Sequence, residues 1–144
     1  MTPELAICER LLATSAVTAI VSQRIYEMVL PQSPTLSLVL VQLITDPRNY
    51  HLRGTNTLSR TRIQVDAYVP ERARSGSDDP GANLNALADA VDGSLNGQTF
   101  TVGDPVSMRV TGVFQQDRRK LREPDELRYL RVMLDYIVWT QTVS

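Results

Sequence analysis

The chain has 144 residues, of which 42% are hydrophobic and 22% are charged. That composition is close to the average of soluble globular domains and argues against a disordered chain, a collagen-like repeat or a coiled coil. Fifteen basic and sixteen acidic side chains give a formal net charge of −1, which provides no global attraction to nucleic acid or to an anionic membrane. We therefore expect one domain spanning residues 1–144, without a membrane partner.

The N-terminus and the cysteine content indicate the cellular compartment. Glu4 and Glu9 interrupt the first apolar residues and no basic segment precedes them, so this segment does not resemble a secretory signal peptide. Cys8 is the only cysteine, so no internal disulfide is possible and nothing requires an oxidising compartment. We expect a cytosolic origin, and we interpret Cys8 as a buried core residue rather than a reactive thiol.

Two consecutive helical segments are predicted near the N-terminus. Thr2 and Pro3 are typical of an N-cap followed by proline at the first helical position. Apolar residues then recur at helical spacing, as expected of one buried stripe: Leu5, Cys8, Leu11 and Leu12. Thr14 can cap a second, short helical segment, which we expect to end near Gln23.

A strongly apolar strand is predicted over residues 36–45. Its apolar residues occupy both faces, which is typical of a strand covered on both sides. We interpret it as the central strand, covered by helix on one side and with another subunit as the candidate cover on the other. Residues 46–58 include Pro47 and Gly54 and show no periodicity, so we predict a long connecting loop there.

Residues 60–69 alternate strictly, which predicts a strand with one dry and one solvent-exposed face. The exposed face would carry Arg62, Gln64, Asp66 and Tyr68. The polar segment of about 71–82 offers almost nothing to a core and predicts a mobile loop. Apolar spacing then predicts a helix from residue 84 onward, which stops between Gly93 and Gly97.

The remaining segments are predicted to be strands over residues 98–102, 106–115 and 127–140. In the middle segment one face is expected to hold Val106, Met108, Val110 and Phe114. The last segment has one apolar face and one amphipathic face with Met133 and Trp139, and it far exceeds the usual strand length of about 5–6 residues. We expect part of it to overhang the domain as an unpaired edge, and we infer self-assembly from that surface.

These elements together predict an α+β fold. We expect a mostly antiparallel sheet of about four to five strands, packed by an N-terminal helix and a central helix. A long C-terminal β-hairpin would complete the sheet.

Catalytic and cofactor chemistry finds little support in the sequence. His51 is the only histidine, and no Walker-type or dinucleotide-binding glycine motif occurs. One cysteine and one histidine cannot supply the common zinc sites, so we expect no metal and no cofactor. An enzyme would need paired carboxylates such as Asp66 and Asp135, which the sequence places on strand faces without showing them to be neighbours. We therefore expect no enzyme.

Two basic segments are candidate partner contacts. Residues 118–122 place four cations within five positions, but acidic residues flank them, so we interpret this run as a hairpin tip or protein-contact loop, with backbone-phosphate contact as the alternative. Residues 48–53 mix arginine with aromatic side chains, a composition enriched at protein interfaces, and a plain surface loop is the alternative. The candidate contact residues are Arg48, Tyr50, His51, Arg53, Arg118, Arg119, Lys120 and Arg122.

Several segments have a recognisable order along the chain. The most specific are residues 24–26 (RIY) followed by 30–32 (LPQ), the strand 62–68 (RIQVDAY), and the terminal segment 130–136 (LRVMLDY). Their order resembles the tail-completion, or tail-terminator, family of long-tailed bacteriophages and related gene-transfer particles. The likeness covers nearly the whole chain. One departure is the polar segment 71–82, because in the family pattern the helix follows this strand closely.

The resemblance implies a small α+β subunit that forms a ring of six copies on the head-proximal end of the finished tail tube. The ring would end tube polymerisation and present the surface for head joining. Its partners would be copies of itself, the tail tube protein and a neck or connector protein, with nucleic acid met only as DNA passing through the lumen. The protein would be part of the virion tail, after assembly in the bacterial host cytoplasm.

A hypothesis from a different class stays open. A neck adaptor that contacts the portal region and DNA would bind DNA in a salt-sensitive manner. That binding would be lost on neutralising Arg118, Arg119 and Lys120.

Overall fold

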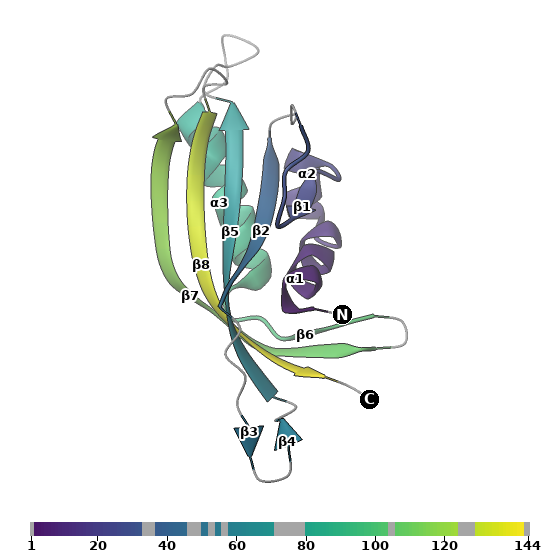
Figure 1. The fold of residues 1–144 in the computed structure, drawn as a ribbon. Helices are drawn as coiled ribbons and strands as arrows, with labels where there is room; N and C mark the ends of the chain where they lie inside the picture. Colours follow the sequence, from purple (N-terminus) through teal and green to yellow (C-terminus); the bar gives the residue numbers. More distant parts are fainter. Residues whose placement is uncertain are drawn as a thin grey trace.

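The computed structural model describes residues 2–32, 37–45, 50–51, 54–55, 58–70, 80–103, 106–123 and 129–142. Within them the chain forms three helices, a six-stranded sheet and a separate two-stranded one (Figure 1). The helices are α1 Pro3–Leu12, α2 Ser15–Val21 and α3 Pro80–Leu95. The strands are β1 Ile25–Glu27, β2 Leu38–Thr45, β3 Tyr50–His51, β4 Gly54–Thr55, β5 Leu58–Pro70, β6 Phe100–Val102, β7 Met108–Glu123 and β8 Tyr129–Thr142.

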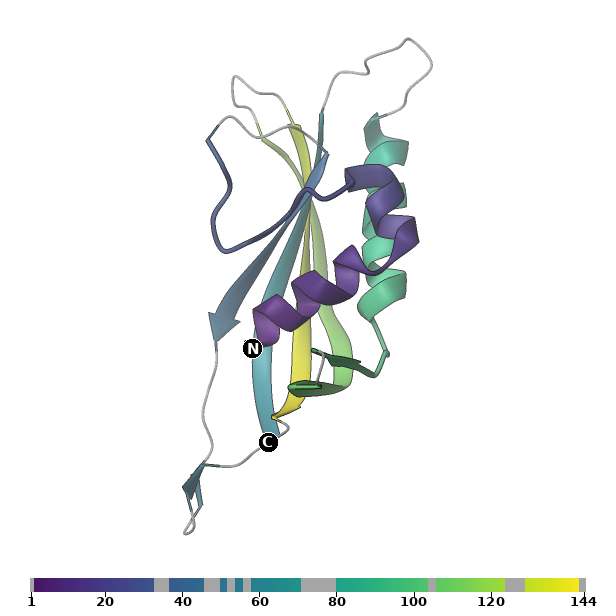
Figure 2. The same ribbon diagram turned by 90° about the vertical axis from the view of Figure 1, so that its right-hand side faces the viewer.

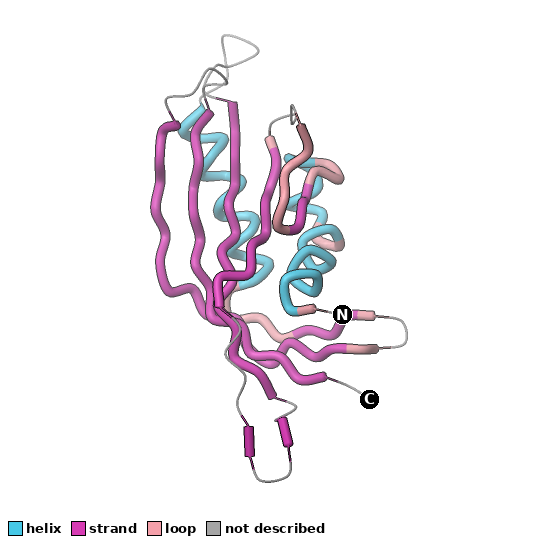
Figure 3. The backbone as a smooth tube through the Cα atoms, viewed as in Figure 1, coloured by secondary structure: helices cyan, strands magenta, loops and turns pink. Residues whose placement is uncertain are grey.

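The large sheet is covered by helices on one face only. Its strand order is β1-β2-β5-β8-β7-β6, in which β1 and β2 run parallel and the other neighbours are antiparallel. The helices lie together on one side of the strands (Figures 2 and 3), and we call the opposite side the helix-free face. The core between helices and sheet includes Ile7, Leu11, Val65, Leu87, Val91 and Leu134.

This arrangement confirms the α+β class with its N-terminal and central helices. The sheet has six strands instead of four to five. The strand that sequence analysis missed is β1, because its three residues are too few to show alternation.

The N-terminal helices begin and end where their flanking residues predict. The Thr2 side chain accepts a hydrogen bond from the Leu5 backbone N–H at 3.3 Å, and Pro3 is the first residue of α1. Thr14 precedes α2, although its side chain makes no capping hydrogen bond. Ser22 ends α2 with a φ of 57°, a left-handed conformation that turns the chain toward β1.

The chain itself covers both faces of β2. Val39 and Val41 enter the main core, whereas Leu38 and Leu40 are buried on the helix-free face. The second pair packs against a small cluster of the same chain: Tyr68, Tyr26, Leu30 and Tyr129. The expectations for this strand therefore need correction, because β2 lies second from the sheet edge and needs no other subunit to bury these leucines.

The centre of the large sheet is formed by β5 and β8. β8 pairs with β5 from Leu58 to Pro70 and with β7 from Met108 to Glu123, so it has a neighbour on each side along its length. The expected unpaired edge on this last strand is therefore wrong. The long C-terminal hairpin is present, since β7 and β8 are antiparallel neighbours.

A β-bulge in β7 reverses the face that the sequence assigns to Phe114. The register against β8 shifts between Val110 and Gly112. Val110 and Val113 are both buried toward the core, whereas Phe114 is 50% exposed on the helix-free face. Its ring covers Gly112, where an added Cβ would lie 2.8 Å from Phe114 Cε2. The expected face is wrong because one extra residue inverts the alternation beyond it.

Polar contacts join the C-terminal part of α3, and the turn after it, to the sheet. The buried Tyr136 of β8 donates its hydroxyl to Asp92 Oδ1 at 2.8 Å, and burial, followed by this hydrogen bond, raises the pKa of Tyr136. After the helix, the backbone N–H of Gly97, at a φ of 73°, donates to the Val113 carbonyl at 2.7 Å. The last turn of this helix thus lies against the outer edge of β7.

Candidate functional site

The helix-free face holds a network of buried charges where β5 and β8 lie side by side. Asp66 accepts hydrogen bonds from Arg131 Nη2 and Gln64 Nε2, both at 2.8 Å. Asp135 Oδ2 lies 3.1 Å from Arg62 Nη2. Asp66 is fully buried and Asp135 nearly so, although the sequence predicts a solvent-exposed face here. That prediction is wrong at Asp66 because the polar residues bind one another.

The two aspartates of this network are the pair that an enzyme hypothesis would require. Asp66 is opposite Met133 and Asp135 is opposite Gln64, so the carboxylates are diagonal neighbours on one face. Burial is the largest cause that raises the pKa of Asp66; Arg131 and Gln64 lower it, and Asp135 raises it further. Because each aspartate is already bound by an arginine, we interpret the pair as part of the sheet's structure.

Metal ligands do not gather in the described part of the chain. No group of three or more histidine, cysteine, aspartate or glutamate residues there is placed to hold an ion. In the same residues, no helix is both long and apolar enough to cross a membrane.

The basic run 118–122 lies within strand β7 and is not a hairpin tip. Strand alternation sends its side chains to two faces. Arg118 Nη1 binds Asp89 Oδ1 of α3 at 3.2 Å, and Lys120 binds Asn85 of the same helix. Arg119 points to the helix-free face, 3.1 Å from Asp117 and 4.0 Å from Asp135. Arg118 and Arg119 are therefore paired with carboxylates on opposite faces of β7, and Lys120 binds an uncharged amide, so these three cations do not form one cluster.

The structure describes the backbone of three of the remaining predicted contact residues: Tyr50, His51 and Arg122. Tyr50 and His51 form β3, which pairs with β4 inside the segment predicted to be a loop. Arg48 and Arg53 lie outside the described residues. Arg122 belongs to β7, but the structure does not describe its side chain.

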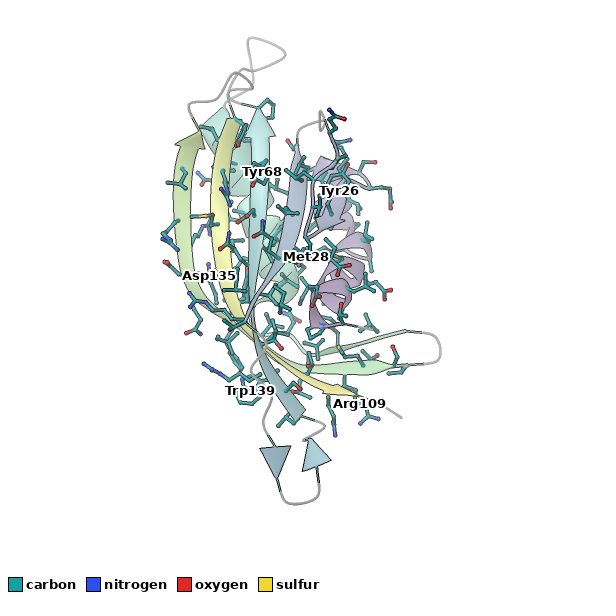
Figure 4. The ribbon with its side chains drawn as sticks, in the orientation of Figure 1. Tyr26, Met28, Tyr68, Arg109, Asp135 and Trp139 are labelled. Atoms are coloured by element: carbon teal, nitrogen blue, oxygen red, sulfur yellow. The ribbon has the colours of Figure 1, made fainter. Side chains whose placement is uncertain are left out.

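A second surface on the helix-free face combines aromatic, aliphatic and basic side chains. Register places Arg60 opposite Trp139, and Trp139 opposite Gly112 beside Phe114, while Arg109 and Leu58 both flank Gln141. Figure 4 shows Trp139 and Arg109 at the same end of the sheet. We call this set the basic aromatic patch: Leu58, Arg60, Arg109, Phe114 and Trp139. The sequence places Trp139 on the amphipathic face of the last strand. It does not place Phe114 on this surface, because the bulge in β7 is not visible in the alternation.

Cys8 lies in the core near three glutamates. Burial, followed by Glu27, Glu4 and Glu9, raises the pKa of the Cys8 thiol to about 12. This agrees with the interpretation of Cys8 as a buried residue. The thiolate, which is the reactive form, is therefore scarce at pH 8.

We expect the Cys8 thiol of the native chain to react with a colorimetric disulfide reagent at pH 8 about a hundredfold or more slowly than in the unfolded chain. Absorbance of the released chromophore, with and without guanidinium chloride, measures both rates. Equal rates would show that Cys8 is accessible and ionised.

The helix-free face thus combines an ion-paired network with exposed aromatic, aliphatic and basic side chains. The sequence pattern of the tail completion protein gp17 family matches residues 5–141, so this chain belongs to the family of tail completion protein gp17. Among solved structures, a chain from the virion of a native gene transfer agent particle matches with a TM-score of 0.67 at 18% identity, covering 96% of this chain and 94% of that chain. No curated protein sequence matches the chain.

These comparisons confirm the resemblance inferred from the sequence. Like the other members of its family, the chain is a structural protein of the virion tail and not an enzyme. The gene transfer agent chain has the same fold over almost its full length.

Proposed function

We propose that this chain forms a closed ring of six copies on the head-proximal end of the tail tube. There it ends tube polymerisation and presents the surface to which the head joins. Membership of the tail completion family across residues 5–141 carries this proposal. The shared fold with a chain of a gene transfer agent virion supports it.

Capping of this kind needs contact surfaces and no chemistry. The end of a growing tube exposes the faces that would accept the next tube subunit, and a bound ring blocks them if its far side cannot bind tube protein. Identical subunits close into a ring through two different faces each, when successive rotations return to the first copy. A sheet with helices on one side only offers such unlike faces.

We further propose that the segment 46–58 contacts the tube or the neck protein. Figure 1 shows β3 and β4 projecting past the end of the large sheet and past the helices. Their pairing, Tyr50 with Thr55 and His51 with Gly54, makes the projection a small hairpin. The sequence of residues 48–53 mixes arginine with aromatic residues, a composition that is enriched at protein interfaces.

Capping can be tested with purified tube protein that polymerises in the presence and absence of this chain. We expect substoichiometric amounts of the chain to stop growth and shorten the tubes, measured as a length distribution in negative-stain micrographs. Particles assembled without the chain should carry overlong tails and unjoined heads. A heat-unfolded sample serves as the control. Unchanged tube lengths, together with normal head joining in its absence, would contradict the proposal.

A further inference from the structure

We propose that neighbouring copies of this chain bind through two oppositely charged surfaces, the basic aromatic patch of one copy and an acidic patch around α1 of the next. This inference rests on the proposed ring and names its subunit contact. Both surfaces belong to the same chain and lie on different elements, so the contact is head-to-tail.

The basic aromatic patch has unused charge and exposed apolar surface. Arg60 and Arg109 are exposed, and neither forms an ion pair with a described acidic residue. Phe114 and Leu58 are 50% and 44% exposed, and Trp139 between them is half-buried. Arginine and aromatic side chains together are typical of the residues that contribute most to protein interfaces.

The acidic patch consists of Glu4, Leu5, Glu9 and Leu12 of α1 with Glu27 of β1. Leu5, Glu9 and Leu12 follow helical spacing and are exposed, so they form one outward stripe. Glu4 and Glu9 lie on α1 and Glu27 lies on β1, two elements that contact each other, so the three glutamates belong to one region of the molecule. None of them forms an ion pair within the described part of the chain.

Glu4 adds an independent sign that this patch is incomplete. Its side chain is 8% exposed, and its Oε2 atom has no hydrogen-bond partner in the described structure. A buried carboxylate oxygen without a donor is costly, and a guanidinium from outside would satisfy it. Arginine supplies fourteen of the fifteen basic residues of this chain, including both free cations of the basic aromatic patch.

A second copy is the occupant that these observations favour. Each patch carries the charge that the other lacks, while the whole chain is near neutral with a formal charge of −1. Each also exposes apolar side chains that water would leave on contact. The basic aromatic patch is on the helix-free face and α1 packs on the opposite side of the sheet (Figure 2), so the chain cannot join the two patches within itself.

Charge reversal tests the contact in solution. One variant carries Arg60→Glu and Arg109→Glu, a second carries Glu9→Arg and Glu27→Arg, and a third carries all four substitutions. We expect the native chain to have a mass near six times 16.1 kDa by light scattering at low salt. The first two variants should be monomers, and the third should regain the ring because both charges are inverted together.

Controls separate loss of the contact from loss of the fold and from a change in net charge. Lys120→Glu and Asp89→Arg reverse exposed charges on the α3 side and should leave the ring mass unchanged. Circular dichroism and thermal melting of each variant must match the native chain. Should a charge-reversal variant fail to fold, Arg60→Gln with Arg109→Gln replaces it, and a rise of at least tenfold in the dissociation constant is expected.

Zero-length crosslinking provides a second measurement. Lys120 is the only lysine, so Arg60→Lys combined with Lys120→Arg leaves one side-chain amine, placed in the basic aromatic patch. A carbodiimide should then join this lysine to Glu9 or Glu27 of another copy, as peptide mass spectrometry would show.

Three outcomes would overturn the proposal: a native chain that is monomeric at every concentration, rings that persist in both two-site variants, or a fourfold variant that folds but stays monomeric. Loss of tube binding with intact rings would likewise overturn it and assign the basic aromatic patch to the tube protein. The capping proposal has a separate readout, tube length, so the two can fail independently.

Discussion

Replacing Leu134 with alanine is expected to lower the free energy of unfolding by about 2–5 kcal/mol. Leu134 is fully buried on the helix-covered face of β8, opposite Val65 of β5. Deleting its branched side chain removes buried apolar surface and leaves a cavity that strands paired on both sides cannot collapse to fill. Urea denaturation followed by circular dichroism measures this loss.

The matched control is Leu121→Ala in the same hairpin. Leu121 is 43% exposed on the helix-free face, so its removal should change stability by about 0.5 kcal/mol or less. Similar losses for both variants would show that Leu134 does not lie in the core described here.

Replacing Asp66 with alanine is expected to cost about 3–5 kcal/mol. Asp66 is fully buried and accepts two hydrogen bonds of 2.8 Å, from Arg131 and Gln64. Its removal leaves a partly buried guanidinium and an amide without this acceptor, which costs more than the ion pair contributes when intact. The free energy of unfolding measured in urea at pH 7 gives the loss.

Asp89→Ala is the control for this ion pair. Asp89 binds Arg118 at 3.2 Å, but its side chain is 71% exposed, so the loss should stay within about 1 kcal/mol. Equal losses for the two aspartates would contradict the structural role assigned to the network on the helix-free face.

The pKa of Asp66 also predicts a pH dependence. Burial raises this pKa above the ordinary value of 3.8, so the folded state holds the proton more tightly than the unfolded state. The part of the Asp66 contribution to stability that depends on protonation is therefore complete below about 3.8 and declines as the pH rises through the raised pKa. The stability difference between the native chain and Asp66→Asn should fall over this interval, as urea denaturation at several pH values would show. A difference that grows with pH would reverse the sign of the shift.

The buried charges have a consequence for assembly. Arg62 and Arg119 are held by Asp135, and Arg131 by Asp66, so these arginines serve the sheet itself. Arg60 and Arg109 lie on the same face, and neither has such a partner among the described residues. The helix-free face therefore has a centre of ion-paired charges and two exposed arginines at one end.

Sequence analysis predicted the local structure well. The N-cap at Thr2, the helix that ends before Gly97 and the alternating strand that became β5 all depend on residues close together in the chain. Capping, turn preference and alternation act over a few residues, so they leave a visible pattern. The order of such segments was also enough to indicate the tail completion family.

The candidate site was predicted less well. The sequence predicts one basic cluster of Arg118, Arg119 and Lys120, but strand alternation turns Arg118 and Lys120 toward α3 and Arg119 toward the helix-free face. Phe114 was predicted on the same face as Met108 and Val110, and a single bulged residue places it on the opposite face. Neither feature could be predicted without knowing which strand pairs with β7 and in which register.

The sequence by itself determined the class of fold, the apolar faces of β5 and β8 and the family to which the chain belongs. Only the tertiary structure decided that β8 has neighbours on both sides and that Asp66 and Asp135 are buried with arginine partners. It also decided that two charged patches on different elements form no ion pairs with the described residues. The physical reason is the separation along the chain of the residues that interact. Pairing between β5 and β8 joins residues about seventy positions apart, and its register is set by core packing rather than by local preference.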